Sequence, residues 1–404
     1  MNKSVKVLYL VHRVPFPPDK GDRIRSYHVL RRLCDFAAVD VAFLTDEKVP
    51  VETINALGTL CDNVHVYDAG RVRRWLRASM TFATGRSATE GLFYSRQLQR
   101  DVDEWRVAGC YDAIVIFSSS MVPYVMHPQL RSRVVADLVD VDSEKFFGYA
   151  AHSAGLLAWL YRHEGKRVRR LERFATSLRA VVLATVPEAE LFKQVVPGSE
   201  PVVIQNGVDL NYFSPRNDIE PDPYTCVFMG ALDYRANVTG LEWFCNEVWP
   251  HLRPDYPNSE FRIVGRRPVA RVRALDSIDG VNVVGEVPDV RPWLQSSSVA
   301  VAPLLVARGV QNKVLEAMAC GVPVIGTASA LNGLACETDV DAVEANSPQE
   351  WSAALDSIWN DKTKQHTLAI NARKYVEQYH NWDVCLSRME EIVRCATDQA
   401  LPLA

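Results

Sequence analysis

The sequence predicts an α/β protein built from two doubly wound, parallel-sheet domains. Short apolar runs alternate with helix-length segments, as strands and helices do when helices cover both faces of a parallel sheet. This alternation starts again after a polar segment rich in Pro, Asp and Asn, Arg216 to Pro223. The chain of 404 residues is 48% hydrophobic, which is enough to form two separate cores.

Cysteine usage and hydropathy exclude several classes of protein. The nine cysteines form no C-x-x-C pair and no cluster with histidine, so we expect neither a disulfide framework nor a zinc site. The first apolar run, Val7 to Val11, is too short for a signal peptide. No later run reaches the ~20 apolar residues that a membrane-spanning helix needs, so we expect a cytoplasmic protein.

The charge is unevenly shared between the two halves of the chain. Residues 1–200 contain 28 Lys and Arg against 23 Asp and Glu, a net charge of +5, and the remainder contains 17 against 26, or −9. A basic first half indicates an anionic partner, such as a membrane face. We expect no nucleic-acid partner, because no recognised binding motif is present.

The first domain opens with a strand, a helix and a second strand, over Val5–Val11, Ile24–Leu33 and Val39–Leu44. No G-x-G-x-x-G follows the first strand, which argues against a dinucleotide-binding dehydrogenase. Further strands are predicted at Ala113–Phe117, Val134–Leu138 and Val181–Thr185.

Two basic stretches of the first domain allow different interpretations. Residues 71–86 combine five arginines with Trp75, Leu76, Met80 and Phe82. They suit either a helix in a membrane interface or an ordinary surface helix packed on the sheet. Residues 162–173 interleave basic residues with two glutamates, which we interpret as a solvated helix face.

Carboxylates gather where the strand that begins at Val134 ends. Asp137, Asp140 and Asp142 lie at or just after its carboxyl end, where catalytic groups collect in open α/β sheets. Asp140 is the candidate catalytic residue of this group. Asp142 or Ser143 alternatively serves as the N-cap of a helix that begins near Glu144.

The second domain repeats the alternation, with predicted strands at residues 226–229, 261–264, 281–284, 299–302 and 322–325. A helix from Lys313 to Ala319 lies between the last two strands, with Asn312 as its expected N-cap and Gly321 and Pro323 closing it. Helical spacing directs Val314, Leu315, Met318 and Ala319 toward the sheet. It leaves Lys313 and Glu316 on the other face, over the strand ends.

Arg308 and Lys313 place positive charge beside the positive end of this helix. Such cations are unfavourable by roughly 0.3–1 kcal/mol, unless an anion binds between them. Free N–H groups, Gly309 and two cations suit a phosphate or diphosphate, and Glu316 is placed to accept hydrogen bonds from sugar hydroxyls. The alternative is an exposed salt bridge between Lys313 and Glu316, worth roughly 0.2–0.5 kcal/mol.

The run from Glu316 to Ile325, EAMACGVPVI, resembles the signature of the family 4 retaining glycosyltransferases, which have the GT-B fold of two Rossmann-like domains facing a cleft. The resemblance implies that Glu316 binds the nucleotide ribose of a sugar donor. The first of the family's two glutamates is replaced by Arg308. The resemblance also implies a reaction that uses no metal ion and no cofactor.

Further donor-binding positions follow from this resemblance. Gly21 matches a first-domain glycine that lets backbone N–H groups face the donor phosphates, and Arg235 is the remaining cation of a turn that holds the diphosphate in relatives. Asn237, nearby, is interpreted as a helix cap. Gly265 and Val287 occupy places where the family passes the nucleotide base. The remaining donor-site residues are Gly309, Val310 and Val314.

A narrower resemblance covers nearly the whole chain. Residues 139–150, VDVDSEKFFGYA, and residues 309–319, GVQNKVLEAMA, are similar to sugar transferases of PEP-CTERM/exosortase exopolysaccharide loci. Residues 206–215 resemble the family stretch that ends the first domain. We therefore expect an acceptor-side domain over 1–215 with a crossover helix over about 382–400, and a nucleotide-sugar-binding domain over 224–380.

Together these observations predict a retaining hexosyltransferase that passes a sugar from a nucleotide-diphosphate donor to a glycan or polyprenyl-linked glycan, with peripheral contact to the inner face of the membrane. Arg308, Lys313 and Asp140 are the expected catalytic residues. Two alternatives stay open. One is a sugar-nucleotide epimerase of the same fold, and the other is a non-catalytic partner that binds nucleotide or glycan.

Overall fold

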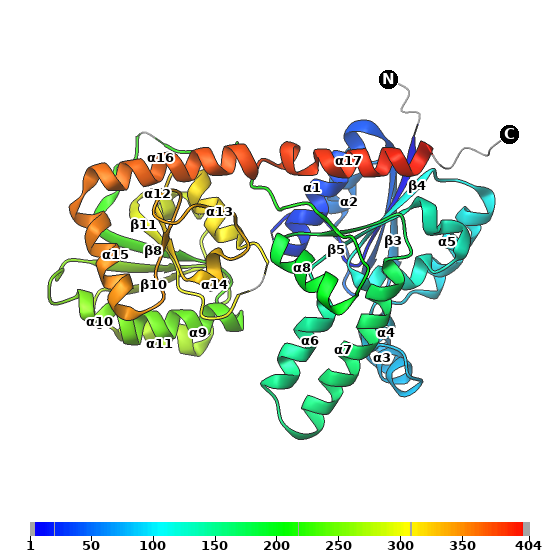
Figure 1. The fold of residues 1–404 in the computed structure, drawn as a ribbon, viewed down its shortest axis with the longest axis horizontal. Coiled ribbons are helices and arrows are strands. Elements are labelled where there is room, and N and C mark those ends of the chain that lie inside the picture. Colours follow the sequence, from blue (N-terminus) through cyan, green and yellow to red (C-terminus); the bar gives the residue numbers. More distant parts are fainter. Residues whose placement is uncertain (1–4, 20, 217, 308, 399–404) are drawn as a thin grey trace. The chain divides into compact units, whose positions relative to one another are not determined.

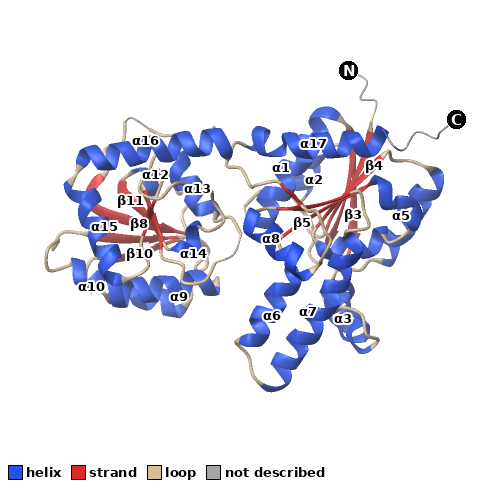
Figure 2. Ribbon diagram, in the orientation of Figure 1, coloured by secondary structure: helices blue, strands red, loops and turns tan. Residues whose placement is uncertain are grey.

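The computed structural model describes residues 5–19, 21–216, 218–307 and 309–398 of the chain, which forms two compact units (Figures 1 and 2). Unit 1 comprises the described residues up to Gln205 and those from Leu386 onward, and unit 2 is Asn206–Cys385. The last helix, α17 (Trp382–Asp398), therefore begins in unit 2 and ends in unit 1.

Unit 1 contains a seven-stranded parallel sheet in the order β3-β2-β1-β4-β5-β6-β7. The strands are β1 (Lys6–Val11), β2 (Ala38–Thr45), β3 (Asn63–Asp68), β4 (Ala113–Phe117), β5 (Val134–Val139), β6 (Ala180–Leu183) and β7 (Val202–Val203). The helical elements are α1 (Gly21–Phe36), α2 (Val51–Leu60), α3 (Arg73–Ala83), α4 (Ala88–Leu92), α5 (Arg96–Ala108), η1 (Ser119–Val125), η2 (Pro128–Arg133), α6 (Asp142–Ala151), α7 (Gly155–Ala175) and α8 (Val186–Val195).

Unit 2 contains a six-stranded parallel sheet in the order β10-β9-β8-β11-β12-β13. The strands are β8 (Asp222–Met229), β9 (Glu260–Val264), β10 (Val281–Gly285), β11 (Ser297–Ala302), β12 (Val324–Gly326) and β13 (Val343–Glu344). The helical elements are α9 (Arg235–Trp243), η3 (Phe244–Val248), α10 (Trp249–Leu252), α11 (Ala270–Ala274), η4 (Leu275–Ser277), α12 (Arg291–Gln295), α13 (Asn312–Ala319), α14 (Ala328–Leu331), α15 (Pro348–Asn360) and α16 (Lys362–Tyr379).

The central strands are apolar over most of their length because helices cover both faces of each sheet. Every residue of β4 and of β11 is buried, and β1 is buried after its first residue. Tyr9 of β1 pairs in register with Val41 of β2 and Val115 of β4. The prediction of two doubly wound parallel sheets is confirmed, and β4 has the predicted bounds. The edge strands β3, β7 and β13 were not predicted, because β3 is only partly buried and the other two are two residues long.

A buried ion pair joins α1 to the sheet of unit 1. The Arg25 guanidinium donates to both carboxylate oxygens of Asp137, at 2.9 and 3.1 Å, and to the backbone carbonyl of Ile204 at 2.8 Å. Both side chains are almost completely buried. Asp137, the first carboxylate of the predicted cluster, therefore has a structural role, and burial raises its pKa even though Arg25 opposes the shift.

The prediction of a solvated helix face over residues 162–173 is confirmed for Arg162, Lys166, Arg170 and Arg173, which are exposed, and wrong for the two glutamates between them. All of these residues belong to α7, where Glu164 and Glu172 are buried. Glu164 accepts hydrogen bonds from the backbone N–H groups of Ala88 and Thr89, both at 2.8 Å, at the start of α4. Glu172 accepts one from the N–H of Ser143 at 2.8 Å. The two carboxylates satisfy helix-start donors that no intrahelical carbonyl reaches.

Candidate functional site

The strand order of unit 2 reverses between β8 and β11. From β8 the chain proceeds outward through β9 and β10, and from β11 it proceeds the other way through β12 and β13. In open α/β sheets, the crevice at the carboxyl ends of the strands beside such a reversal is the usual ligand position. The segments that leave β8 and β11 at this edge lead to α9 and to α13.

Two glycines shape the end of this sheet edge. Gly230 follows β8 and Gly265 follows β9, both with positive φ angles, of 156° and 155°. A Cβ atom on Gly265 would overlap the carbonyl oxygen of Gly230. A Cβ atom on Gly230 would be 2.9 Å from the Asn237 amide nitrogen and 3.3 Å from the Lys313 ammonium. The absence of side chains at these two positions thus lets the backbones and the polar groups come together.

Helix α13 presents an uncapped amino end. Its N-cap position is Gln311, and no side chain caps its first turn among the described residues. The prediction that Asn312 is the N-cap was wrong, because Asn312 is the first helical residue. Its side-chain oxygen accepts a hydrogen bond from Asn206 at 3.4 Å. The predicted end is confirmed, because the helix stops at Ala319 and Gly321 has a φ of 70°. An uncapped first turn leaves backbone N–H groups available to an anion.

Lys313 is directed into this edge. Its ammonium donates a 2.6 Å hydrogen bond to the side-chain oxygen of Asn237 in α9 and lies 4.5 Å from the ring centre of Phe228 in β8. The prediction that Asn237 caps a helix was wrong, because Asn237 lies inside α9 and is buried. Its side-chain amide donates to the Ala231 carbonyl at 2.8 Å. The ammonium is therefore positioned by α9 and β8.

The charges of Lys313 and Glu316 are both weakened by burial. Partial burial lowers the pKa of Lys313 to about 7, against the favourable influence of Glu316. Burial raises the pKa of Glu316 to about 7, and Lys313 opposes that shift. The alternative of an exposed salt bridge is wrong, because neither side chain is exposed. A negatively charged ligand beside Lys313 would favour the protonated form of this side chain and would therefore raise the pKa of Lys313.

The remaining predicted donor residues of unit 2 lie around the same edge. Arg235 is exposed in the first turn of α9. Val287 follows β10 and is half-buried, while Val314 is buried in α13.

The loop before α13 is held by close backbone contact. Gly309 has a φ of 66°, and its carbonyl oxygen lies against Gly333, where there is no room for a Cβ atom. Val310 is half-buried and packs on the core of unit 2. Arg308, one of the two predicted cations, lies outside the described residues.

The other predicted site residues belong to unit 1. Gly21 is the first residue of α1 and is exposed. The Asp140 carboxylate accepts a 2.9 Å hydrogen bond from Lys145, whose ammonium also contacts Asp142 at 3.1 Å. These two carboxylates raise the pKa of Lys145. Asp140 thus has a cationic partner from α6.

The predicted cap of α6 was wrong. Its N-cap is Val141, and no side chain caps the helix among the described residues. The Asp142 carboxylate instead accepts from the Ser119 hydroxyl at 2.6 Å, and the Ser143 hydroxyl donates to Glu172.

Sequence reasoning gave no role to His12, which follows β1 at the carboxyl edge of unit 1. Its ring stacks on Phe117 with centroids 5.8 Å apart and meets Phe93 edge-on at 5.3 Å. Burial, followed by the nearby Arg13 charge, lowers its pKa to about 4, so the imidazole is neutral at pH 7. A histidine directly after a predicted strand was the signal that could have identified it.

Two features are absent from the described residues. No group of three or more His, Cys, Asp or Glu side chains in this part of the chain is arranged to hold a metal ion. No helix within the described ranges is both long and apolar enough to cross a bilayer.

The comparisons with known proteins agree with this architecture. Residues 223–361, about a third of the chain and all within unit 2, match the family model described as Glycosyl transferases group 1. HepE from Anabaena, solved in complex with UDP and glucose, superposes with a TM-score of 0.66 at 14% identity over 96% of this chain and 99% of its own. Sucrose-phosphate synthase from Thermosynechococcus elongatus gives 0.68 at 16% identity over 96% and 98%.

A glycosyltransferase from Rickettsia africae gives a TM-score of 0.62 at 12% identity over the full length of both chains. At sequence identities this low, the structural matches show a shared fold. The match to the group 1 family lies on unit 2, whose sheet edge carries Lys313 and Glu316. The chain is a glycosyltransferase of the GT-B fold.

Proposed function

We propose that this chain is a family 4 retaining glycosyltransferase that moves a sugar from a nucleotide-diphosphate donor to a glycan or lipid-linked glycan acceptor. In this proposal the donor binds to the domain of residues 224–380 and the acceptor to the domain of residues 1–215. The similarity to HepE, solved with UDP and glucose, supports a nucleotide sugar as donor.

A single observation is central to the proposal, namely the ammonium of Lys313 beside the uncapped start of α13. A partly buried lysine with a pKa of about 7 is costly to the free protein, and its hydrogen bond to Asn237 does not supply a counter-charge. A diphosphate that contacts this ammonium and the first-turn N–H groups would offset that cost. The site is therefore suited to a ligand with concentrated negative charge.

The same groups explain how the reaction would proceed. Cleavage of the bond between the sugar and the diphosphate leaves negative charge on the leaving phosphate oxygen. Lys313 and the α13 N–H groups would stabilise that charge, with Arg308 and Arg235 as additional cations. In the proposed front-face reaction, the acceptor hydroxyl attacks from the side of the leaving group and passes its proton to the departing phosphate, so the anomeric configuration is retained.

The other donor-site assignments follow the family resemblance. Glu316 would accept hydrogen bonds from the ribose hydroxyls, and Gly265 and Val287 would border the base. Gly309, Val310 and Val314 shape the segment beside the phosphates, and Gly21 at the start of α1 would face them from the first domain. Asp140 is proposed on the acceptor side, where it accepts a 2.9 Å hydrogen bond from the Lys145 ammonium.

The biological setting is proposed from the narrower resemblance to PEP-CTERM/exosortase-associated transferases. It implies exopolysaccharide synthesis on a polyprenyl diphosphate carrier. Such a carrier would place the enzyme in the cytoplasm, at the inner face of the membrane.

A thermal-shift screen against UDP-, GDP- and ADP-sugars tests the donor assignment, because a ligand that binds only the native state raises the melting temperature. We expect one nucleotide class to raise it, and Lys313→Ala to abolish that shift. Lys362→Ala is the matched control, since Lys362 is an exposed lysine in the first turn of another helix of unit 2, α16. An unchanged shift in Lys313→Ala would place the diphosphate elsewhere.

Activity with the donor so identified separates the remaining alternatives. NMR of the anomeric proton in the product should show the same configuration as in the donor. Slow hydrolysis of the donor without any acceptor would argue against a non-catalytic binding partner. Epimerised nucleotide sugar formed without an acceptor would instead favour an epimerase.

A further inference from the structure

Helix α3 of unit 1 turns an apolar stripe toward solvent. Trp75, Leu76 and Met80 are 60%, 64% and 69% exposed, and Val72, just before the helix, is exposed as well. Helical spacing places these residues on one side, while Ala78 is the buried residue of the helix. Of the two sequence interpretations, a helix with its apolar side packed on the sheet is therefore wrong for this segment.

A second apolar element lies beside α3, at the turn of the α6–α7 hairpin. Tyr149, Leu156, Leu157 and Trp159 are all about half or more exposed. The thirteen residues 149–161 contain no Asp, Glu, Lys or Arg. Figure 1 shows α6 and α7 projecting from the body of unit 1 with α3 next to them. We call α3 and this hairpin turn together the apolar surface.

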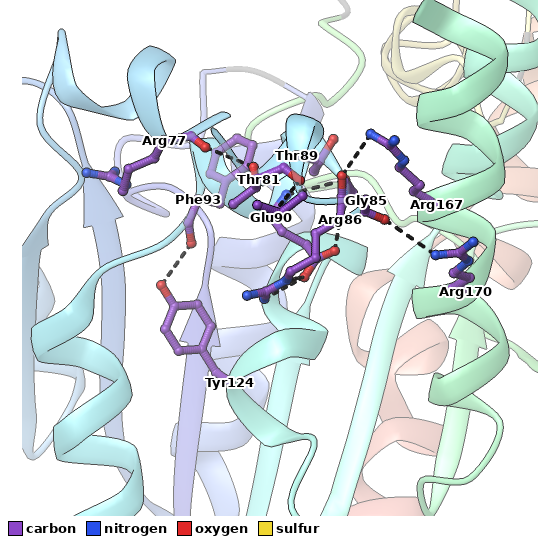
Figure 3. Close-up of polar contacts among 12 residues, drawn as sticks. Arg77, Thr81, Gly85, Arg86, Thr89, Glu90, Phe93, Tyr124, Arg167 and Arg170 are labelled. Atoms are coloured by element: carbon purple, nitrogen blue, oxygen red, sulfur yellow. Dashed lines mark hydrogen bonds and ion pairs between the residues drawn. The ribbon is translucent and has the colours of Figure 1, made fainter. Parts of the chain in front are cut away.

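Contacts between α7 and the α3–α4 segment fix the two parts of the apolar surface to each other. The Trp159 ring meets the Phe82 ring at 6.1 Å, and the Arg167 guanidinium lies 4.0 Å from the Phe82 ring centre. Arg167 donates to the carbonyls of Phe82 at 2.8 Å and Arg86 at 3.1 Å, and Arg170 donates to that of Gly85 at 3.4 Å (Figure 3). These contacts hold the apolar side chains in one arrangement.

The segment that contains α3 carries charges of one sign. Residues 71–86 contain five arginines and no acidic residue. Arg74 pairs with an aspartate, Arg77 donates to backbone carbonyls and Arg86 pairs with a glutamate. Arg71 and Arg73 are exposed and stand on either side of Val72 in the sequence, at the start of α3. An apolar stripe with tryptophan and arginine at its border suits the interface of an anionic bilayer, where rings enter the headgroup region and guanidinium groups meet lipid phosphates.

We propose that the apolar surface of unit 1 docks on a bilayer that contains anionic phospholipid. Helix α3 follows β3, and the hairpin follows β5. Because the strands are parallel, both elements lie at the carboxyl edge of the sheet, the edge to which Asp140 and Gly21 belong. Docking by this surface brings the acceptor-side edge to the membrane, where a lipid-linked acceptor would be. The docking itself rests on the exposed residues alone and does not require the proposed reaction.

Co-sedimentation of the full chain with vesicles tests this proposal. We expect binding to vesicles of phosphatidylcholine with about 30% phosphatidylglycerol, and much weaker binding to phosphatidylcholine alone. Arg71→Gln with Arg73→Gln should weaken binding to the anionic vesicles by about fivefold per arginine and reduce its dependence on salt. Trp75→Ala with Leu76→Ala should weaken it at least tenfold, because apolar insertion is lost.

Matched controls and a second measurement make the outcomes decisive. Val107→Ala removes a 76% exposed apolar side chain near the end of α5, at the opposite edge of the same sheet, and should leave vesicle binding unchanged. The Trp75 and Leu76 variant should keep the wild-type melting temperature, since these side chains are exposed. Equal binding by this variant and wild type would overturn the proposal. So would concentration-dependent oligomers in light scattering that the variant abolishes without vesicles, because the surface would then bind a second copy of the chain.

Discussion

Raising the pH from 6 to 8 tests the role of Lys313 in donor binding. Burial lowers the pKa of this ammonium to about 7 in the free protein. If the diphosphate binds only the charged form, the protein is about ten-elevenths competent at pH 6 and about one-eleventh competent at pH 8. Affinity should therefore fall about tenfold, or about 1.4 kcal/mol, between these pH values.

Glu316 acts in the same direction. Its pKa is raised to about 7, so the carboxyl is mostly neutral at pH 6 and ionised at pH 8, where it repels a phosphate and lowers affinity further. For both Lys313 and Glu316, we therefore expect donor binding above pH 7 to be accompanied by proton uptake. An ordinary exposed lysine would keep its charge up to about pH 10 and would therefore give no change in affinity between pH 6 and pH 8.

Isothermal titration calorimetry with UDP-glucose, or with the nucleotide sugar that the thermal-shift screen identifies, measures this effect. A diphosphate diester has no ionisation of its own in this range, so the change reports the protein. Titration at pH 8 in buffers of different ionisation enthalpy gives the proton uptake directly. Lys313→Met should bind weakly at pH 6 and lose most of the pH dependence. If this variant keeps the tenfold slope, Lys313 is not the group that titrates, and the reasoning is refuted.

Three further predictions concern the framework of the two units. Gly265→Ala should destabilise unit 2 by about 3 kcal/mol, because the new Cβ overlaps the Gly230 carbonyl, and should lower its melting temperature by about 6–12 °C in calorimetry. Arg25→Met should cost about 3–5 kcal/mol in urea unfolding, because Asp137 is left buried without its partner. Glu164→Gln should cost about 2 kcal/mol, because one of its oxygens is replaced by an NH2 group that faces N–H donors.

The first two of these predictions have a control in the chain. Gly58→Ala, in α2, adds a Cβ with no atom within 4 Å, so it should stabilise slightly. An equal loss in Gly58→Ala and Gly265→Ala would contradict the steric explanation. Adding Asp137→Leu to Arg25→Met should recover much of the lost stability. No recovery would mean that the guanidinium packing, rather than the unpaired carboxylate, accounts for the cost.

The sheets and one helix of the site could be predicted from the sequence, because burial on both faces of a parallel sheet requires continuous apolar runs. The same reasoning located α13, whose inward residues Val314, Leu315 and Met318 are buried. The helix start was displaced by one residue, from Lys313 to Asn312, because N-cap propensity alone does not fix a boundary.

What the sequence could not show was the pairing of polar groups far apart in the chain. Lys313 meets Asn237, 76 residues earlier, and no local pattern marks that contact. Glu164, among arginines on α7, looked solvated, because its role depends on N–H donors of Ala88 and Thr89 at the start of another helix. The exposure of Trp75 and Leu76 was likewise undetermined, since the same helical pattern suits packing on a sheet.

The most direct test of the central claim is a crystal structure of the chain with the bound nucleotide sugar. We expect the diphosphate to contact the first-turn N–H groups of α13 and the Lys313 ammonium to lie within hydrogen-bond distance of a phosphate oxygen. A diphosphate bound elsewhere, with Lys313 still bonded only to Asn237, would contradict the claim.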